Sequence, residues 1–379
     1  MDKVYGYLGP QGTYCEEALC KYLGNKEEKR TPFPSIEQVL AAVKDNSVTH
    51  GLIPLENSIE GTVNIAIDMI ASEPELKIVG EVILPVRHNL LIKPGARRED
   101  IRIIISHPQA LAQCRNYLNK NFPGAVLKPV NSTAEAAQAA AADDGSVAAI
   151  GNKKAGYNYG LVVAEEGIQD CLENRTRFVL VSKQKAPVTG AAKTSLVLSI
   201  TDRPGGLYQI LKEFALANIN LTKIESRPAK TSFGDYLFFI DLVGHAADPV
   251  VKKCLESIED MSASFRVLGS YTVWEEPERK NRTAGAEKTT TLTLEELRQN
   301  IDIIDYQIVD LLAQRTQLVS LVGNLKNGLD GIRDETREGE VLNRVKNNAV
   351  KKGVSAELIE QIYRDLFNHF VDLQRSQQI

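Results

Sequence analysis

The sequence has few of the features that secreted, zinc-binding or membrane-spanning proteins require. Its 379 residues contain five cysteines, which are Cys15, Cys20, Cys114, Cys171 and Cys254. An odd number of widely spread cysteines, with no pair two residues apart, fits neither a disulfide framework nor a zinc site. We therefore expect buried thiols and no metal.

Long apolar runs and an excess of basic charge are also lacking. No uninterrupted apolar run reaches the length of about 18 residues that a membrane helix requires. The first residues lack the basic region and apolar stretch of a secretory signal. Lys and Arg total 45 against 49 Asp and Glu, a net charge of -4, whereas nucleic acids and anionic membranes attract a concentrated basic surface. We expect a cytoplasmic protein that binds neither.

The chain length allows two or three domains at about 100 to 200 residues each. Residues 1–183 alternate β-branched runs with helical patterns, which is typical of α/β folds. One sheet of so many strands would be wide for this length, so we predict two α/β lobes with a cleft between them. The strands are expected at 3–8, 48–53, 78–84, 101–106, 125–130, 146–150, 161–164 and 177–182, and the helices at 14–23, 35–45, 61–71, 107–120 and 132–143.

Two stretches of linker composition divide the rest of the chain. Residues 184–194 and 275–291 are rich in Pro, Gly, Lys, Glu and Thr and have no apolar period. The segment 194–274 between them predicts the order strand, helix, strand, strand, helix, strand, which is ferredoxin-like. The third domain is expected at 288–379.

The third domain is predicted to be entirely helical. Apolar residues step by three and four along one long helix, with a single exception at Arg315, at positions 294, 297, 301, 304, 308, 311, 315, 318, 322 and 325. Such a helix spans about 50 Å, more than two shorter helices at 335–351 and 355–376 can cover. We therefore expect a homodimer, or a dimer of dimers, formed through this region.

A cation on an apolar helix face requires an anion, because an unpaired buried guanidinium is costly. Lys326 lies three turns after Arg315 and points the same way, about 16 Å along the axis. Arg298 lies about 25 Å from Arg315 and is turned by about 100°. If Arg298 is functional, it serves a site whose other members come from a second chain.

The segment from about 292 to 376 resembles the all-helical chorismate mutases. The resemblance rests on Leu297-Arg298, Ile301-Asp302, Ile304-Asp305, Arg315, Lys326, Asp334, Arg337-Glu338 and Gln374. It implies that Arg315, Lys326 and a partner's Arg298 hold the substrate carboxylates, with Arg337 also binding substrate. Glu338 and Gln374 would address the ether oxygen, and Asp334 the ring hydroxyl. The family usually has a small hydroxyl residue where this chain has Phe370.

In the first domain, polar clusters follow three predicted strands. They are Leu8-Gly9-Pro10-Gln11-Gly12-Thr13-Tyr14, Pro54-Leu55-Glu56-Asn57-Ser58-Ile59-Glu60-Gly61-Thr62-Val63 and Ser106-His107-Pro108-Gln109-Ala110-Leu111. Strand ends that lead into helices are where α/β folds bind ligands. The Gly-Lys-Ser/Thr of a phosphate loop is absent, and each cluster taken alone reads equally well as a helix cap.

Together with Ser132-Thr133, Ala148-Ala149-Ile150-Gly151 and Asn174-Arg175-Thr176-Arg177-Phe178, these clusters resemble prephenate dehydratase. The resemblance implies a two-lobed fold like that of periplasmic binding proteins. It also implies a catalytic cleft and residues close to it, namely Asn57, Ser58, Ser106, Gln109 and Thr176, with Thr133 and Arg177 nearby. Thr176 would donate to the leaving hydroxyl, and no cofactor would be needed. His88 and His107 are candidate bases, although a His beside a helix start more often has a structural role.

The middle domain resembles the ACT regulatory domain of these enzymes. The matching blocks are Asp202-Arg203-Pro204-Gly205-Gly206-Leu207 and Asn218-Ile219-Asn220-Leu221-Thr222-Lys223-Ile224-Glu225-Ser226-Arg227-Pro228. The resemblance implies a phenylalanine site formed by paired domains, with the residues Gly205, Gly206, Leu207, Asn220, Leu221, Glu225, Ser226, Arg227 and Pro228. A plain turn and an edge strand are the alternative.

The three resemblances together imply a bifunctional enzyme of phenylalanine biosynthesis. It would convert chorismate to prephenate and prephenate to phenylpyruvate, under regulation by phenylalanine. Two alternatives stay open at this point. One is a ligand sensor without catalysis, and the other is a dehydratase whose helical tail only dimerises, for which Phe370 is the best argument.

Overall fold

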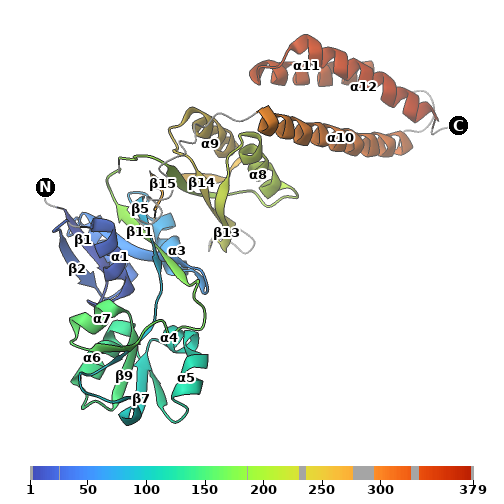
Figure 1. The fold of residues 1–379 in the computed structure, drawn as a ribbon. Helices are drawn as coiled ribbons and strands as arrows, with labels where there is room; N and C mark the ends of the chain where they lie inside the picture. Colours follow the sequence, from blue (N-terminus) through green and yellow to red (C-terminus); the bar gives the residue numbers. More distant parts are fainter. Residues whose placement is uncertain are drawn as a thin grey trace. The chain divides into compact units, whose positions relative to one another are not determined.

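The computed structural model describes residues 3–24, 26–185, 187–229, 236–275, 294–325 and 333–376. Figure 1 shows their helices and strands. The chain forms two compact units, Met1–Ala284 and Gly285–Ile379, and each is described by itself. Within these described ranges, no helix combines the length and the hydropathy needed to cross a membrane.

The first lobe is a sheet with helices on both faces. Its elements are β1 (Val4–Leu8), α1 (Tyr14–Leu23), β2 (Lys29–Phe33), α2 (Ile36–Lys44), β3 (His50–Asn57), β4 (Gly61–Thr62), α3 (Asn64–Ser72), β5 (Lys77–Pro85) and β11 (Arg175–Ser182). The strand order is β2-β1-β3-β11-β5, with β4 paired to β3. Helices α2 and α3 cover one face and α1 the other.

The second lobe is a sheet of order β10-β6-β9-β7-β8. Its elements are β6 (Asn89–Ile92), η1 (Arg98–Asp100), β7 (Ile103–Ser106), α4 (Pro108–Gln113), α5 (Arg115–Asn121), β8 (Val126–Pro129), α6 (Thr133–Ala142), β9 (Val147–Gly151), α7 (Lys153–Asn158) and β10 (Val162–Glu165). The chain enters this lobe after β5 and returns to the first lobe as β11. The prediction of two α/β lobes is confirmed.

Several details of the predicted elements were wrong. The helix expected at 107–120 is broken at Cys114 into α4 and α5. Strand β2 was missed because its Lys-Arg-Thr-Pro-Phe sequence has the polar, proline-containing character of an edge strand. The cysteines are all free, and three are buried, but Cys171 is exposed in the turn before β11, contrary to the expectation of buried thiols.

The next domain has the predicted ferredoxin-like order. It consists of β12 (Ala192–Ser199), α8 (Gly206–Leu216), β13 (Leu221–Pro228), β14 (Tyr236–Val243), α9 (Pro249–Met261) and β15 (Ser264–Thr272), with strand order β13-β14-β12-β15. Alternate residues of a strand point to opposite faces. Leu196 and Leu198 therefore pack under α8 and α9, while Val197 and Phe239 join the core of the first lobe.

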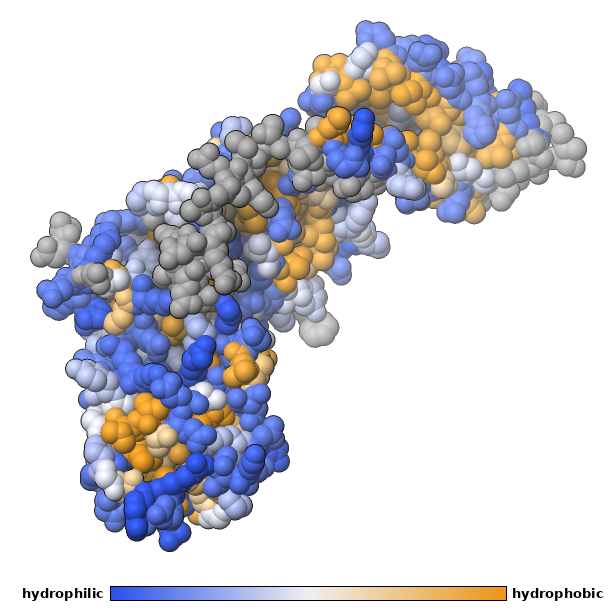
Figure 2. All heavy atoms as spheres, in the orientation of Figure 1, coloured by the Kyte–Doolittle hydropathy of each residue, from blue (hydrophilic) through white to orange (hydrophobic). Residues whose placement is uncertain are grey.

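The described residues of the second unit form three helices, α10 (Leu294–Leu325), α11 (Glu335–Lys351) and α12 (Ala356–Ser376), as predicted. Helix α12 packs against both others. Many large apolar side chains of this unit stay exposed, and Figure 2 shows apolar side chains gathered on its visible face. They include Leu294, Ile301, Ile304, Ile308, Leu311, Leu318, Leu321, Val322, Val350, Leu358 and Ile362.

The backbones of β15 and β5 approach each other closely at one glycine. A Cβ on Gly269 would lie 2.0 Å from the carbonyl oxygen of Ile78. Gly269→Ala must therefore separate the two strands, and we expect a loss of roughly 1–3 kcal/mol in the free energy of unfolding. Urea denaturation of the full chain measures this free energy, with the fluorescence of Trp274, which lies just after β15, as the signal. Gly124→Ala is the matched control, because no heavy atom lies within 4 Å of its Cβ position. A Gly269→Ala midpoint equal to that of Gly124→Ala would contradict the close packing.

Candidate active site

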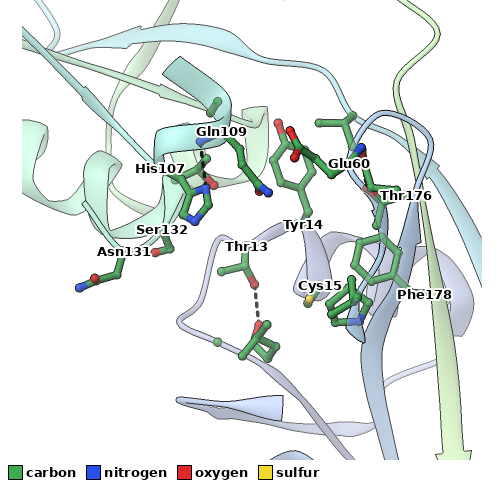
Figure 3. Close-up of a pocket in the computed structure, with 18 of the residues that line it drawn as sticks. Thr13, Tyr14, Cys15, Glu60, His107, Gln109, Asn131, Ser132, Thr176 and Phe178 are labelled. Carbon is green, nitrogen blue, oxygen red and sulfur yellow. Dashed lines mark hydrogen bonds between the residues drawn. The ribbon is translucent and has the colours of Figure 1, made fainter. Parts of the chain in front are cut away.

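A cavity of about 940 Å³ lies between the two lobes. The first lobe contributes residues from β3, α1 and β11, and the second contributes the starts of α4 and α6 (Figure 3). Among the polar residues that line it are Thr13, Tyr14, Asn57, Glu60, Thr62, His88, His107, Gln109, Gln113, Asn131, Ser132, Thr133, Asn174 and Thr176. The cavity therefore offers mainly neutral hydrogen-bonding groups.

Asn57 and Thr176 form the central pair of the cavity wall. They lie opposite each other where β3 pairs with β11, and Nδ2 of Asn57 donates to Oγ1 of Thr176 at 2.8 Å. Oδ1 of Asn57 accepts from the backbone N–H groups of Ile59 and Glu60 at 2.9 and 3.0 Å, which fixes the orientation of the amide. Because the Thr176 oxygen accepts from an amide, its own proton can be donated into the cavity.

A chain of hydrogen bonds continues from this pair to a buried histidine. Asn57 also donates to Asn174 at 2.9 Å, and Asn174 donates to Oε1 of Gln113 at 2.9 Å. Nε2 of His88 lies 2.9 Å from the same Gln113 oxygen, and Nδ1 lies 2.9 Å from the hydroxyl of Tyr14. A neutral ring with its proton on Nε2 donates to Gln113 and accepts from Tyr14, whose hydroxyl shares its single proton between Nδ1 and the Arg87 carbonyl at 2.8 Å.

Burial keeps His88 neutral. The residue is 3% exposed, and this desolvation lowers the pKa of His88, although its hydrogen bond to Gln113 acts in the opposite direction. Both ring nitrogens are occupied, so His88 positions Gln113 and does not act as a base. Burial also lowers the pKa of His107, whose Nδ1 caps α4 by accepting from the backbone of Gln109 at 3.3 Å.

The other residues implied by the dehydratase resemblance divide into two groups. Gln109 and Thr133 line the cavity. Ser58 and Ser106 do not. The hydroxyl of Ser58 accepts from the backbone of Arg175 at 2.9 Å, and the fully buried hydroxyl of Ser106 donates to the Ile150 carbonyl at 2.7 Å. Both serines therefore brace the backbone beside the cleft.

Arg177 lies away from the cavity, contrary to its expected place near the cleft. Nε donates to Glu81 at 2.8 Å, Nη1 to Asp241 at 2.5 Å and Nη2 to the Tyr271 hydroxyl at 2.7 Å. Burial alone would lower the pKa of Arg177, but Tyr271, Asp241 and Glu81 outweigh it and raise that pKa. Successive residues of a strand face opposite sides, so Thr176 and Arg177 cannot share one site.

The residues of the two ACT-like blocks lie in different surroundings. Gly205, Gly206 and Leu207, at the start of α8, line a second cavity of about 300 Å³. Leu221 begins β13, and the carbonyl of Asn220, directly before the strand, accepts from the backbone of Val243. Further along β13, Glu225 accepts from Thr62, Arg227 pairs with Asp68 at 2.9 Å, and Ser226 and Pro228 are exposed.

The helical unit brings two of its predicted residues into the contact between α10 and α12. The guanidinium of Arg315 lies 4.5 Å from the ring centre of Phe370 and 5.8 Å from that of Phe367. The side chain of Gln374 donates to the carbonyl of Val319 at 2.9 Å, one turn after Arg315. Nη1 of Arg315 is buried and has no hydrogen-bond partner within the part of the chain that the structure describes.

The remaining predicted residues of this unit that the structure describes lie at the start of α11 or on the surface. Asp334 caps α11 by accepting from the backbone of Arg337 at 2.9 Å, and the Arg337 guanidinium is exposed beside Glu340. Glu338 pairs with Arg333 at 3.2 Å. Arg298 is exposed on α10, and Lys326 lies outside the described residues.

Sequence reasoning missed Gln113, which joins His88 to the Asn57–Thr176 pair. A signal was present, because Gln113 lies four residues after Gln109 and shares its helix face. No group of three His, Cys, Asp or Glu side chains that could hold a metal ion occurs among the described residues.

Comparison with known proteins gives a family for each part of the chain. Residues 5–186 match the model of prephenate dehydratase, residues 194–260 the ACT domain and residues 297–375 chorismate mutase type II. The bifunctional chorismate mutase/prephenate dehydratase of Aquifex aeolicus is 39% identical over 265 residues, which are 70% of this chain and 72% of that protein.

Two solved structures are similar to the chain. Prephenate dehydratase of Arthrobacter aurescens in complex with L-Phe has a TM-score of 0.67 at 34% identity, and the match covers 80% of this chain and 99% of that one. GqqA, described as a novel type of quorum quenching acylase, has a TM-score of 0.65 at 28% identity over 73% of this chain and 100% of that one.

The lowered pKa of His88 predicts a measurable titration. An unshifted imidazole is half protonated at a pH of about 6.5, whereas we expect His88 to stay neutral there. Ring nitrogen chemical shifts, assigned with His88→Gln, report the protonation state. Below that pH the unfolded chain takes up a proton that the folded chain resists, so this histidine makes the fold less stable as the pH falls. A ring half protonated at a pH of about 6.5 would contradict the buried, neutral assignment.

Proposed function

Because this chain belongs to the prephenate dehydratase family, we propose that it converts prephenate to phenylpyruvate in the cavity between its two lobes. Its C-terminal unit supplies the preceding step, from chorismate to prephenate, and phenylalanine regulates the enzyme through the ACT domain. The observation that carries the dehydratase assignment is the Thr176 hydroxyl, held by Asn57 in a cavity of mainly neutral donors.

The dehydration requires little more than these groups provide. In prephenate the bond from the ring to the carboxylate breaks, its electron pair makes the ring aromatic, and the hydroxyl leaves on the far side of the ring. Thr176 donates a hydrogen bond to that departing hydroxyl, and a proton that ultimately comes from solvent completes water. The products are carbon dioxide, water and phenylpyruvate. The side chain of Gln109 and the N-terminal amides of α6 are the groups that we assign to carboxylate binding.

The contacts of Thr176 also favour a lyase over an acylase. Acyl transfer by a threonine needs a neighbouring base that takes the hydroxyl proton. The neighbour of Oγ1 is the NH₂ group of Asn57, which donates a hydrogen bond and cannot accept a proton. The arrangement suits a hydroxyl that donates to a leaving group.

The mutase assignment is supported by Nη1 of Arg315, which is buried and has no hydrogen-bond partner among the described residues. Leaving a buried cationic donor unpaired is costly, and a substrate carboxylate would supply the acceptor. Rearrangement of chorismate needs a compact substrate conformation and stabilisation of charge on the ether oxygen, which cations and amide donors such as Gln374 provide. The ring of Phe370 packs against the Arg315 guanidinium and so stabilises the cation.

We propose that this unit forms a homodimer in the cytoplasm, where a second copy covers its exposed apolar side chains. Ile301, Ile304, Ile308 and Leu311 are each more than two-fifths exposed on α10. Arg298, exposed on the same helix, serves the site of the second copy together with that copy's Arg315. Lys326, Asp334, Arg337 and Glu338 keep the substrate-binding and catalytic roles that the resemblance implies.

Replacing Thr176 should separate the two activities. Thr176→Ala is expected to lower the rate of phenylpyruvate formation from prephenate by about 10²–10³-fold, because one donor to the leaving group is lost. Thr176→Ser keeps the hydroxyl and serves as the matched control, with a much smaller loss. Chorismate consumption by the same chain reports folding and should not change. Full dehydratase turnover by Thr176→Ala would rule out its role.

Mixing two mutase variants tests the shared site. Arg298→Ala and Arg315→Ala should each abolish chorismate consumption. In a mixed dimer one site receives both substitutions and the other receives neither. Random pairing of equal amounts then restores about a quarter of the wild-type rate. A co-refolded mixture no more active than the separate variants contradicts a site built from two chains, and dehydratase activity serves as the folding control.

A further inference from the structure

A charged cluster lies behind the Asn57–Thr176 pair, on the opposite face of the sheet. Where β3 pairs with β11, Thr176 lies opposite Asn57, and the neighbouring pair is Arg177 opposite Glu56. Adjacent residues of a strand point to opposite faces. The first pair therefore faces the cavity, whereas Arg177 and Glu56 face the ACT domain.

The cluster joins β11 to the ACT sheet through buried ion pairs. The Arg177 guanidinium bonds to Glu81 of β5 and Asp241 of β14, and Lys193 of β12 pairs with Glu81 at 3.0 Å. The side chain of Glu81 is fully buried, and that of Asp241 is 7% exposed. Two cations and two anions balance, so this part of the cluster fixes β11 and β14 against each other.

A second set of contacts starts from β13, the strand that resembles the phenylalanine-binding block. Nζ of Lys223 lies 3.3 Å from the carboxylate of Glu56, 3.0 Å from that of Glu225, and donates to the hydroxyl of Thr62 at 2.8 Å. Glu225 also accepts from Thr62. Thr62 itself lines the cavity, and Glu56 is the residue before Asn57.

The same face of β13 continues this contact along the first lobe. Arg227 pairs with Asp68 and donates to Asn64, both on α3. Every second residue of β13 from Lys223 to Arg227 therefore bonds to the segment 56–68, which carries one wall of the cavity. β13 is an edge strand, paired on one side only with β14, so it is less constrained than the inner strands.

We propose that Lys223 and Glu56 couple the ACT domain to the active site. A ligand that displaces β13 moves Lys223, and through Glu56 and Thr62 it shifts Asn57 away from the position that holds Thr176. Lys223 and Glu56 are positioning residues, since neither lines the cavity. The proposal rests on the proposed dehydratase function and names the side chains that regulate it. The side chain of Lys223 is 10% exposed and that of Glu56 is 37% exposed, so water screens this ion pair only in part, and a displacement of β13 changes its strength.

The experiment measures the coupling itself. Linkage requires that phenylpyruvate in the active site and phenylalanine on the ACT domain change each other's affinity by the same factor. The quantity is the ratio of the phenylalanine Kd with and without saturating phenylpyruvate, by equilibrium dialysis on the full chain. We expect wild-type enzyme to show a ratio of about 5 or more. Lys223→Met and Glu56→Gln, which remove charge but keep size, should bring it close to 1.

Lys44→Met is the matched control. This substitution also removes a lysine from an ion pair, in this case the surface pair with Glu73 at 2.7 Å, in the lobe that contains Glu56. The variant should keep the phenylalanine Kd ratio of the wild-type enzyme. Inhibition of prephenate turnover by phenylalanine should likewise persist in Lys44→Met and disappear in the other two variants.

The outcomes distinguish a failure of the coupling from a failure of the proposed dehydratase function. If wild-type enzyme does not convert prephenate, the proposed function fails. If it does, two results overturn the coupling. One is a phenylalanine Kd in the wild-type enzyme that phenylpyruvate does not change. The other is a Kd ratio in both Lys223→Met and Glu56→Gln that equals the ratio of the wild-type enzyme. Loss of phenylalanine binding by either variant would also overturn it, because the residue would then be required for binding and not for transmission.

Discussion

The buried guanidinium of Arg177 is the interaction on which the N-terminal unit depends. It lies between the sheet that carries Thr176 and the sheet of the ACT domain, and its three donor groups reach Glu81, Asp241 and Tyr271. Removing one partner of such a pair costs about 3–5 kcal/mol, because the remaining charge stays buried. The position of β11, which carries the proposed catalytic residue Thr176, is therefore set partly by the ACT domain, so the proposed catalysis and regulation both depend on this strand.

Local patterns predicted most of the fold and the centre of the site. The hydrophobic periods predicted the two lobes, the ferredoxin-like order and the long helix α10, since each depends on residues close in sequence. The motifs likewise predicted Asn57, Gln109, Thr133 and Thr176, which line one cavity. These residues stand at strand ends and helix starts, and both are recognisable in a sequence.

The residues that prediction misplaced are those whose role depends on a distant partner. Arg177 follows Thr176 in the motif but faces the other side of β11, where its partner Asp241 is 64 residues away. Ser58 and Ser106 bond to backbone groups 117 and 44 residues away, which no spacing rule reveals. Gln113 differs from the serines, because its spacing from Gln109 placed it on the right helix face, but its bonds to His88 and Asn174 depend on the fold. A motif specifies residue types, whereas the sheet register decides which face each one serves.

Two arginines illustrate how partners distinguish structural from functional charge. Arg177 has all its contacts within the chain, so its charge is already neutralised and it is unsuited to bind a substrate carboxylate. Arg315 rests on the rings of Phe367 and Phe370, and within the described residues its Nη1 atom lacks a partner. Aromatic faces stabilise a cation without neutralising it, so the positive charge stays available to an incoming anion. The aromatic residue at position 370 therefore suits the proposed mutase site, because its ring holds the cation in place and does not occupy Nη1.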